Sequence, residues 1–293
     1  MASAVERGCN LMNDYLALTK PRITWLILMS TGVGYFFGAR GGWNWITLLH
    51  TIIGTGLIAS GTAALNQWYE READAKMRRT QERPLPSGRL NATRALIFAI
   101  SISLAGFLEL ALAVNLLAGL LGLFTLAMYL FVYTPLKQRS PHSTTIGAIP
   151  GAMPPLIGFA AASGTLTIDA WILFAILFLW QFPHFYAIAW MYREDYERAG
   201  ILMLPVVEPD GQSTARQMLI YSLILLPISL LPSFVLMTGN LYLFGAILLG
   251  VLFAYSGLRV VMDRSRLHAR RVLLASVIYL PLLYSLMLFD RPA

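Results

Sequence analysis

The stretch Asn66-Gln67-Trp68-Tyr69-Glu70-Arg71-Glu72-Ala73-Asp74 runs on into Lys76-Met77-Arg78-Arg79-Thr80-Gln81-Glu82-Arg83-Pro84, directly behind a long apolar segment. Because a helix turns about 100° per residue, Asn66, Glu70 and Asp74 share one helical face. A stripe of oxygen ligands followed by a cluster of Lys and Arg suits a magnesium ion bound to a diphosphate. The alternative is that these are ordinary interfacial charges, hydrated and paired with one another.

The composition around this stretch is that of a membrane protein. Of the 293 residues, 57% are hydrophobic and 13% are charged, and the mean hydropathy is +0.63. A soluble domain has about 25% charged residues, so we predict an all-α integral membrane protein. The single cysteine, Cys9, excludes a disulfide framework and a thiolate metal site. The net charge is +7, but the basic residues lie in short loops between apolar segments, which excludes a nucleic-acid-binding face.

Nine apolar segments approach the roughly 20 residues that a helix needs to cross a bilayer. We predict spans at 23–40, 45–66, 93–113, 115–134, 144–163, 168–190, 217–237, 239–258 and 272–289. Long polar loops follow the second and the sixth span, near 67–92 and 191–216, and both are rich in acids. We therefore predict one domain over residues 1–293, made of two related four-helix halves, 18–140 and 141–260, and a ninth helix at 272–289.

The basic residues predict the orientation in the membrane. With a cytoplasmic amino terminus, 20 of the 22 Lys and Arg residues fall on the cytoplasmic side, and only Arg40 and Arg291 lie elsewhere. Cytoplasmic loops are enriched in Lys and Arg, so this bias supports that orientation and an odd number of spans. The first twenty residues contain Glu6 and Asp14 and lack a cleavage pattern, unlike a signal or transit peptide. We expect a multi-pass protein of the bacterial inner membrane.

A second acid-rich segment follows the sixth predicted span. It reads Trp190-Met191-Tyr192-Arg193-Glu194-Asp195-Tyr196-Glu197-Arg198-Ala199-Gly200. Both acidic segments thus lie at cytoplasmic ends of helices. Facing one another, they could hold Mg²⁺ between their carboxylates and the phosphate oxygens of a substrate. Here too the alternative is a set of ordinary interfacial charges.

His184 lies inside the sixth predicted span. In a continuous helix Met191 and Asp195 point close to its direction, and His184 lies roughly 16 Å deeper than Asp195. An ionisable, metal-capable side chain at that depth indicates the wall of a substrate cavity. A hydrogen bond between two helices, made by a satisfied histidine, explains the residue equally well.

Further signals flank the spans. Lys20-Pro21-Arg22 opens the first span, and Lys137 with Arg139 closes the fourth; these groups either reach a diphosphate at the interface or serve as topology anchors. The run Gly147-Ala148-Ile149-Pro150-Gly151-Ala152-Met153-Pro154-Pro155 predicts an interrupted fifth span. Broken helices at membrane depth occur where they line a cavity, although small residues also permit close packing. Glu109, in the third span, has no evident partner.

Six stretches together resemble the UbiA superfamily of intramembrane prenyltransferases. They are Leu18-Thr19-Lys20-Pro21-Arg22, Asn66-x3-Glu70-x3-Asp74-x2-Met77-x-Arg79-Thr80-x2-Arg83-Pro84, Tyr133-Thr134-x-Leu136-Lys137, Pro150-Gly151-Ala152-x-Pro154-Pro155, Trp180-x2-Pro183-His184-Phe185, and Asp195-Tyr196-x2-Ala199-Gly200-x2-Met203-Leu204-Pro205. They cover the first six spans in order, whereas spans 7–9 match only in hydropathy. Within the superfamily they are similar to the enzymes that farnesylate haem.

The resemblance implies a nine-helix bundle around a central cavity that opens toward the lipid and is capped by cytoplasmic loops. Its substrates would be farnesyl diphosphate and haem B, its product haem O, and its cofactor Mg²⁺. The lipid bilayer is the expected surrounding. Whether a haem A synthase or the terminal oxidase assembly machinery is a protein partner stays open.

The resemblance also implies roles for individual residues. The metal and the catalytic step would fall to Asn66, Glu70, Asp74 and Asp195. Arg79, Arg83 and Lys137 would neutralise the departing diphosphate, and His184 would orient or ligate haem. The remaining residues expected to bind substrate are Lys20, Arg22, Arg78 and Tyr192. The superfamily generally shows two aspartates four residues apart in its second motif, but this chain has Ala199 four residues after Asp195. Only Asp195, with Glu194 as a candidate helper, is therefore carried over.

Three other functions compete with this reading. A UbiA-type enzyme with an aromatic acceptor, such as a hydroxybenzoate polyprenyltransferase, usually carries Asp where this chain has Glu70, and the Pro183-His184-Phe185 run favours haem. A secondary transporter also has paired halves and broken helices, but it should show ionisable residues near the centres of several spans. The acids here gather at one face instead. A purely structural membrane subunit leaves the acidic stripe unexplained.

Overall fold

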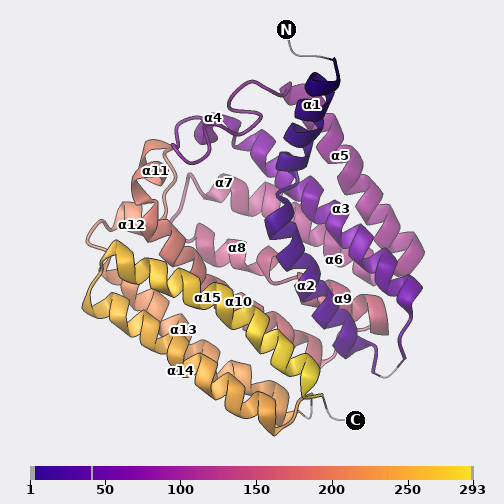
Figure 1. Cartoon of the computed structure of the whole chain (residues 1–293), viewed down its shortest axis with the longest axis vertical. Coiled ribbons are helices and arrows are strands. Elements are labelled where there is room, and N and C mark those ends of the chain that lie inside the picture. The colour runs from indigo at the N-terminus through magenta and orange to yellow at the C-terminus, as the bar shows by residue number, and fades with distance from the viewer. Residues whose placement is uncertain (1–3, 41, 236, 292–293) are drawn as a thin grey trace.

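Helices form all the regular structure in the residues that the computed structural model describes, 4–40, 42–235 and 237–291. In chain order they are α1 (Ala4–Leu18), α2 (Pro21–Gly38), α3 (Trp45–Tyr69), α4 (Arg71–Asp74), α5 (Ala92–Leu108), the π-helical η1 (Glu109–Val114), α6 (Leu116–Ala127), the π-helical η2 (Met128–Tyr133), α7 (Thr134–Leu136), α8 (Ser143–Gly151), α9 (Pro154–Ser163), α10 (Ile168–Met191), α11 (Arg193–Arg198), α12 (Leu204–Val207), α13 (Gln212–Phe234), α14 (Asn240–Met262) and α15 (Arg266–Phe289). Figure 1 shows the long helices side by side, with the short helices α4, α11 and α12 together at one end of the bundle.

Within the described ranges, eight helical stretches are long and apolar enough to cross a membrane. They are Trp45–Tyr69, Ala92–Val114, Leu116–Leu136, Ser143–Ser163, Ile168–Met191, Gln212–Phe234, Asn240–Met262 and Arg266–Phe289, which correspond to predicted spans 2–9. Helix α2 corresponds to the first predicted span and packs along α9 and α3. It has only 18 residues and begins with Pro21 and Arg22, which lower its hydropathy. The all-α membrane bundle is confirmed, whereas the count of nine spans and the cytoplasmic amino terminus stay predictions.

Some helices begin several residues before their apolar, membrane-spanning segment. Helix α13 starts at Gln212 rather than 217, and α15 starts at Arg266 rather than 272. A hydropathy pattern marks the apolar part of a helix, whereas backbone hydrogen bonding continues into the interface. At α15 the side chain of Ser265 accepts a hydrogen bond from the backbone N–H of His268 and so fixes the earlier start.

Helix α1 is absent from the sequence-based expectations. It contains no apolar run long enough to indicate a span, and no spacing signal singled it out. The ring of Tyr15 lies 5.0 Å from that of Phe98 on α5, and Asp14 accepts a 3.0 Å hydrogen bond from Arg89. Contacts with the rest of the bundle therefore hold α1 in place.

The fifth predicted span is interrupted, as its proline and glycine content indicates. Helix α8 ends at Gly151, Ala152 and Met153 form the link, and α9 begins with Pro154. Proline lacks a backbone N–H and is tolerated in the first turn of a helix, where that donor would be unpaired anyway. The interruption at membrane depth is therefore confirmed.

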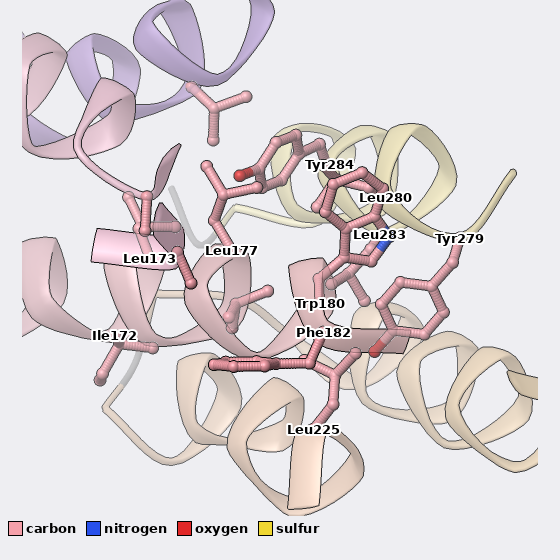
Figure 2. Packing of buried hydrophobic residues seen from close by; sticks show 14 of the residues in the cluster. Ile172, Leu173, Leu177, Trp180, Phe182, Leu225, Tyr279, Leu280, Leu283 and Tyr284 are labelled. Carbon is pink, nitrogen blue, oxygen red and sulfur yellow. The ribbon is translucent and has the colours of Figure 1, made fainter. Parts of the chain in front are cut away.

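Helix α10 forms the centre of the largest hydrophobic core. Figure 2 shows its side chains packed against Leu225 of α13 and against residues of α15. Hydrogen bonds between helices pair two sets of polar atoms in this core: the indole N–H of Trp180 donates to the carbonyl of Ser276 at 2.8 Å, and the hydroxyls of Tyr279 and Ser229 lie 2.7 Å apart. Buried polar groups without partners are costly in an apolar surrounding, so the first bond favours the observed register of α10 on α15 and the second that of α15 on α13.

Burial differs sharply among the spanning helices. In the most apolar window of α10, 61% of the residues are buried inside the protein, but only 17% in the stretch Leu116–Leu136. Leu112 and Phe131 are exposed by 81% and 70%. In water this surface would be unstable, whereas in a bilayer it is solvated by lipid. The α5–α6 side of the bundle therefore faces the lipid.

Helices α2 and α9 approach so closely that only glycine fits at their contact. A Cβ atom added at Gly158 would lie 1.9 Å from the carbonyl oxygen of Thr31, and one added at Gly34 would lie 2.0 Å from the carbonyl oxygen of Pro155. Small residues permit such close approach of membrane helices. This contact holds α2 against the second part of the chain.

Gly158→Ala is expected to lower the melting temperature in detergent, by an overpacking cost of about 1–3 kcal/mol. Gly32→Ala is the matched control on α2, because a Cβ atom there meets nothing within 4 Å. Alanine is the better helix former, so this control should leave stability unchanged or raise it slightly. Equal melting temperatures for the two variants would contradict the close contact of α2 with α9.

Candidate functional site

The predicted acidic stripe keeps its helical spacing across a break in the helix. Helix α3 ends at Tyr69 and α4 begins at Arg71, yet the backbone N–H of Glu70 donates to the carbonyl of Asn66 at 2.9 Å. That of Asp74 donates to the carbonyl of Glu70 at 2.8 Å. Asn66 and Asp74 are each only 1% exposed. The expectation that Asn66, Glu70 and Asp74 share one face is confirmed.

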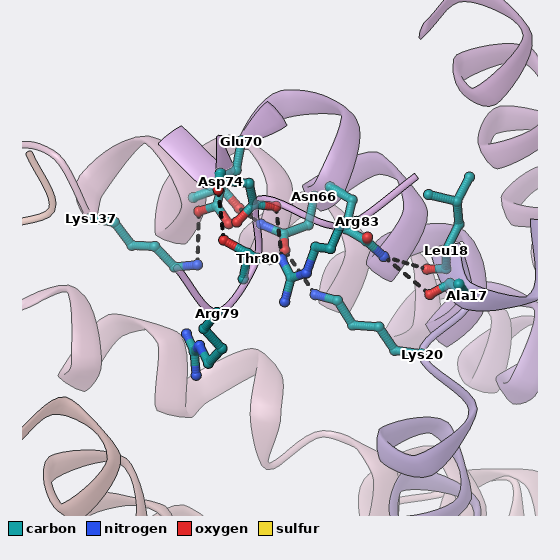
Figure 3. A network of polar contacts seen from close by, with 12 residues as sticks. Ala17, Leu18, Lys20, Asn66, Glu70, Asp74, Arg79, Thr80, Arg83 and Lys137 are labelled. Carbon is teal, nitrogen blue, oxygen red and sulfur yellow. Dashed lines mark hydrogen bonds and ion pairs between the residues drawn. The ribbon is translucent and has the colours of Figure 1, made fainter. Parts of the chain in front are cut away.

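Cations from three separate parts of the chain meet this stripe (Figure 3). Lys137, just after α7, donates to Glu70 Oε1 at 2.8 Å. Arg83 donates to Asp74 Oδ2 at 2.7 Å. Lys20, in the turn before α2, donates to Asn66 Oδ1 at 3.1 Å. The structure thus brings the predicted metal ligands of the first motif together with three of the predicted diphosphate-binding cations. We call these residues, Lys20, Asn66, Glu70, Asp74, Arg83 and Lys137, the charged cluster.

Burial and charge act against each other in this cluster. Burial raises the pKa of Glu70, but Lys137, Lys20 and Asn66 outweigh it and hold the pKa below its usual range. Burial lowers the pKa of Lys137, but Glu70 outweighs it and raises the pKa well above its usual value. Burial, with Arg83 and Lys137 nearby, lowers the pKa of Lys20 to about 8. Glu70 and Lys137 are thus charged at neutral pH, and an added anion would stabilise the charged form of Lys20.

Contacts that the sequence did not indicate hold the residues of this cluster in position. The amide of Gln67 donates to the carbonyl of Leu18 at 2.9 Å and so fixes the turn that carries Lys20. The amide of Asn66 lies 3.4 Å from the hydroxyl of Thr134, on the same segment as Lys137. A conformation with positive φ at Lys20, 48°, completes the turn before Pro21. These contacts set the direction from which each cation reaches the stripe.

The second acidic segment is arranged differently from the expectation. Helix α10 ends at Met191 and Tyr192 forms a turn before α11. His184 and Met191 lie within α10, but the continuous helix expected from His184 to Asp195 is wrong, because it is interrupted at Tyr192. Asp195 is 8% exposed; it accepts a 3.3 Å hydrogen bond from the backbone N–H of Arg78 and pairs with Arg198. The structure therefore ties α11 to the loop after α4.

Arg79 and Tyr192 also meet at this junction. The guanidinium of Arg79 lies 4.8 Å from the ring centre of Tyr192 and donates to the hydroxyl of Tyr196 at 3.3 Å. Arg78 is exposed and contributes its backbone N–H to Asp195. Arg22 is exposed and, in the part of the chain that the structure describes, makes no hydrogen bond or ion pair. The structure does not bring Arg22 into the charged cluster.

His184 on α10 makes a hydrogen bond to the neighbouring helix α15. Its Nδ1 lies 2.8 Å from the hydroxyl of Ser276 on α15, and its ring stacks on Trp180 with centroids 4.7 Å apart. The structure places this residue between α10 and α15, without contact to the charged cluster. The hydrogen bond between helices expected from the sequence is confirmed, and the expected role of His184 toward haem stays a prediction.

Glu109, for which the sequence showed no evident partner, is paired with a histidine in the structure. His50 Nδ1 lies 2.7 Å from Glu109 Oε1. Both side chains are partly exposed, and they join α3 to η1 far from the charged cluster. The pair links two helices and adds nothing to the site.

The donor set of the stripe fits a magnesium ion. Asn66, Glu70 and Asp74 offer only oxygen, the ligand type that Mg²⁺ prefers, and Mg²⁺ typically takes one or two carboxylates together with substrate phosphates. Among the described residues, no three His, Cys, Asp or Glu side chains come together as a ready metal site. The carboxylates of Glu70, Asp74 and Asp195 are therefore not gathered into one group, and the predicted participation of Asp195 stays a prediction.

An apolar cavity of about 120 Å³ starts at Lys20 and extends between α2, α3, α6, η2, α8 and α9. Pro150, Gly151 and Pro154 line it, so the interrupted span forms part of its wall. On α3 the lining residues are Thr55, Ile58, Ala59, Thr62 and Ala63. Thr62, Ala59 and Thr55 precede Asn66 by 4, 7 and 11 positions and so share its face. This row of small side chains was the signal in the sequence that would have indicated the cavity.

The family comparison and the comparison with individual proteins point to the same family of prenyltransferases. Residues 27–283 match the UbiA prenyltransferase family. A protohaem IX farnesyltransferase of Solibacter usitatus is 67% identical over 290 residues, which cover 96% of this chain and 99% of that protein. A protohaem IX farnesyltransferase of Koribacter versatilis is 47% identical over 293 residues, covering 96% of this chain and 94% of that protein.

Solved structures show the same fold. A digeranylgeranylglyceryl phosphate synthase superposes with a TM-score of 0.80 at 17% identity, over 95% of this chain and 98% of that chain. A UbiA homologue of Archaeoglobus fulgidus bound to GPP and Mg²⁺ gives a TM-score of 0.64 at 17% identity, over 94% of this chain and 99% of that chain. At such low identity these likenesses bear on the fold alone.

Proposed function

The chain belongs to the UbiA prenyltransferase family, and we propose that its charged cluster carries out the reaction of its bacterial relatives. That reaction transfers the farnesyl group of farnesyl diphosphate to the vinyl group of haem B, which gives haem O and releases diphosphate. The resemblance to the enzymes that farnesylate haem is confirmed. Membership of this family argues against the two other functions considered, a secondary transporter and a purely structural subunit. The names of the relatives favour haem over an aromatic acceptor.

One observation carries the assignment of the site. Lys20 belongs both to the charged cluster and to the lining of the apolar cavity. A prenyl diphosphate has the same two parts, an anionic head and an apolar chain. With its head in the charged cluster and its chain in the cavity, each part meets a surrounding of matching polarity. The carbon–oxygen bond that must break would then lie near Lys20, between the charged cluster and the cavity.

The ion pairs of the cluster would exchange partners when the donor binds. Glu70 and Asp74, with the side-chain oxygen of Asn66, would hold Mg²⁺, and this ion would supply Lewis-acid stabilisation to the phosphate oxygens. The relative from Archaeoglobus fulgidus contains both Mg²⁺ and GPP. Lys137 and Arg83, now bonded to Glu70 and Asp74, would turn to the diphosphate. Each residue would keep a charged partner throughout.

The cations of the cluster would lower the barrier of the chemical step. As the allylic carbon–oxygen bond breaks, negative charge grows on the departing diphosphate, and Lys20, Arg83 and Lys137 stabilise that charge. The farnesyl cation is attacked by the haem vinyl carbon, which forms the new carbon–carbon bond. Water then adds the hydroxyl group and gives up a proton, which completes the hydroxyethylfarnesyl group. The apolar cavity walls keep bulk water from the cation until haem reacts.

The location and the protein partners are argued from other observations. The protein is a multi-pass membrane protein, and its relatives are bacterial. With the bias of Lys and Arg toward one side, this supports the bacterial inner membrane and a cytoplasmic charged cluster. A haem A synthase or the terminal oxidase assembly machinery would use haem O, and contact with either stays a prediction, as does the division into two four-helix halves.

Expression in a bacterial host that lacks its own haem O synthase tests the function. We expect haem extracts of these cells to contain haem O, identified by chromatography and mass, and cells with an empty vector to contain none. Well-folded protein that yields no haem O would contradict haem as the acceptor. Farnesylation of an added aromatic acid by the same membranes would then identify the other class of acceptor.

A further inference from the structure

A strongly basic basin lies where α10, α11 and the start of α15 meet, and its volume is about 540 Å³. Six arginines line it: Arg78, Arg79, Arg193, Arg198, Arg264 and Arg266. The acids in its wall are Glu194 and Asp195. In the described part of the chain only Arg198 of these six arginines makes an ion pair, with Asp195. The basin therefore carries uncompensated positive charge, which attracts anions.

The outer wall of the basin, Arg193, Arg264 and Arg266, has no part in the donor site described above. Contacts around it hold it in place. The indole N–H of Trp190 donates to the carbonyl of Arg264 at 2.9 Å, and the guanidinium of Arg193 lies 4.4 Å from the ring centre of Trp190. The guanidinium of Arg266 lies 6.0 Å from the ring centre of Tyr192. Arginines held on aromatic rings lose less freedom when they bind a ligand.

The turn before α15 is fixed as well. The side chain of Ser265 caps the helix by accepting a hydrogen bond from the backbone N–H of His268. The ring Nδ1 of the buried His268 lies 2.9 Å from Asp263 Oδ2. Arg264 and Arg266 thus stand on a rigid support rather than on a free loop.

The basin and the apolar cavity are separate compartments. They share no lining residue. The loop between α4 and α5 contributes to both sides: Arg83 bonds to Asp74 in the charged cluster, whereas Arg79 lines the basin. With the prenyl chain in the cavity that begins at Lys20, as the proposed function places it, the diphosphate would lie in the charged cluster. The outer wall of the basin is then free for the second substrate.

We propose that Arg193, Arg264 and Arg266 bind the two propionate groups of haem B. The proposal rests on the proposed function and adds the anchoring site of its acceptor. Guanidinium groups pair with carboxylates through charge-assisted, often bidentate hydrogen bonds. Trp190 and Tyr192 add aromatic surface for the edge of the macrocycle. Since the propionates and the vinyl groups lie on opposite edges of haem, propionates held at the outer wall direct the vinyl edge away from that wall.

The test compares haem B with its dimethyl ester, which has the same macrocycle but no carboxylates. Purified protein in nanodiscs of uncharged lipid is titrated with each, and binding is followed by the change in haem absorbance. Arg264→Gln/Arg266→Gln should weaken binding of haem B about tenfold or more for the lost charge-assisted contacts. The same variant should bind the dimethyl ester as the wild type does. KM for farnesyl diphosphate should not change.

Arg270→Gln/Arg271→Gln is the matched control, because it also removes two positive charges, from exposed positions of α15 that do not line the basin. It should bind both ligands normally, and equal melting temperatures of all variants confirm that they are folded. Unchanged binding of haem B by the double variant overturns the proposal and leaves the proposed function intact. An increase in KM for farnesyl diphosphate, with haem binding unchanged, assigns the basin to the diphosphate instead. A wild type that binds no haem overturns both.

Discussion

Asp74→Asn is expected to reduce the rate of haem O formation by about 10²- to 10³-fold, the range seen when one preorganised electrostatic contact is removed. The carboxylate of Asp74 is 1% exposed and bonds to Arg83 at 2.7 Å. Asparagine keeps its size and one oxygen, but it loses the charge that a divalent ion requires. Initial rates with farnesyl diphosphate, haem B and Mg²⁺, followed by chromatography of haem extracts, measure the effect.

Glu72→Gln is the matched control in the same short helix. Its carboxylate is 85% exposed, and its contact with Arg71 is 3.4 Å. Exposed ion pairs contribute little, so the rate should stay within about twofold of the wild type, as surface substitutions change little. A well-folded Asp74→Asn enzyme with more than a tenth of the wild-type rate would exclude Asp74 as a metal ligand.

Lys137→Met is expected to cost both stability and activity. Lys137 and Glu70 form a 2.8 Å ion pair in which the side chains are only 12% and 10% exposed. Removing one partner leaves a buried carboxylate unpaired, which typically costs about 3–5 kcal/mol. The melting temperature in detergent should fall clearly, and farnesyl transfer should be lost with the cation. Loss of activity in this variant alone therefore cannot separate folding from chemistry.

The double variant Lys137→Met/Glu70→Met separates the two effects. Replacing both members of a buried pair by apolar residues is often neutral or stabilising, so the melting temperature should return toward that of the wild type. Farnesyl transfer should stay absent, because the variant lacks both a metal ligand and a diphosphate-binding cation. Recovery of activity together with stability would mean that the pair has a structural role only.

The sequence predicted those parts of the site that depend on local spacing. The common face of Asn66, Glu70 and Asp74 follows from 3.6 residues per turn, and the structure keeps it across the break between α3 and α4. The interrupted fifth span follows from proline chemistry in the same way. The expected continuous helix from His184 to Asp195 is interrupted because Tyr192 has a non-helical backbone conformation. No residue there signals the turn as clearly as the prolines of the fifth span do.

Contacts between distant parts of the chain were beyond local reasoning. Glu70 and Lys137 are 67 positions apart, and His50 and Glu109 are 59 apart. Each pair depends on how whole helices pack, which spacing along one helix does not determine. The same holds for α1, which has no spanning signal and is placed by contacts such as that of Tyr15 with Phe98. The pairing of each acid in the site with a particular base is therefore known only from the structure.

These pairings give three acids of the resting site a basic partner each: Glu70 pairs with Lys137, Asp74 with Arg83, and Asp195 with Arg198. A lone magnesium ion would have to displace cations that then repel it, and a lone diphosphate would leave the displaced carboxylates beside its own charge. The two ions arriving together satisfy both sets of side chains. By thermodynamic reciprocity, each ion then raises the affinity for the other by the same factor. The paired side chains thus favour binding of the metal and the donor together over binding of either one alone.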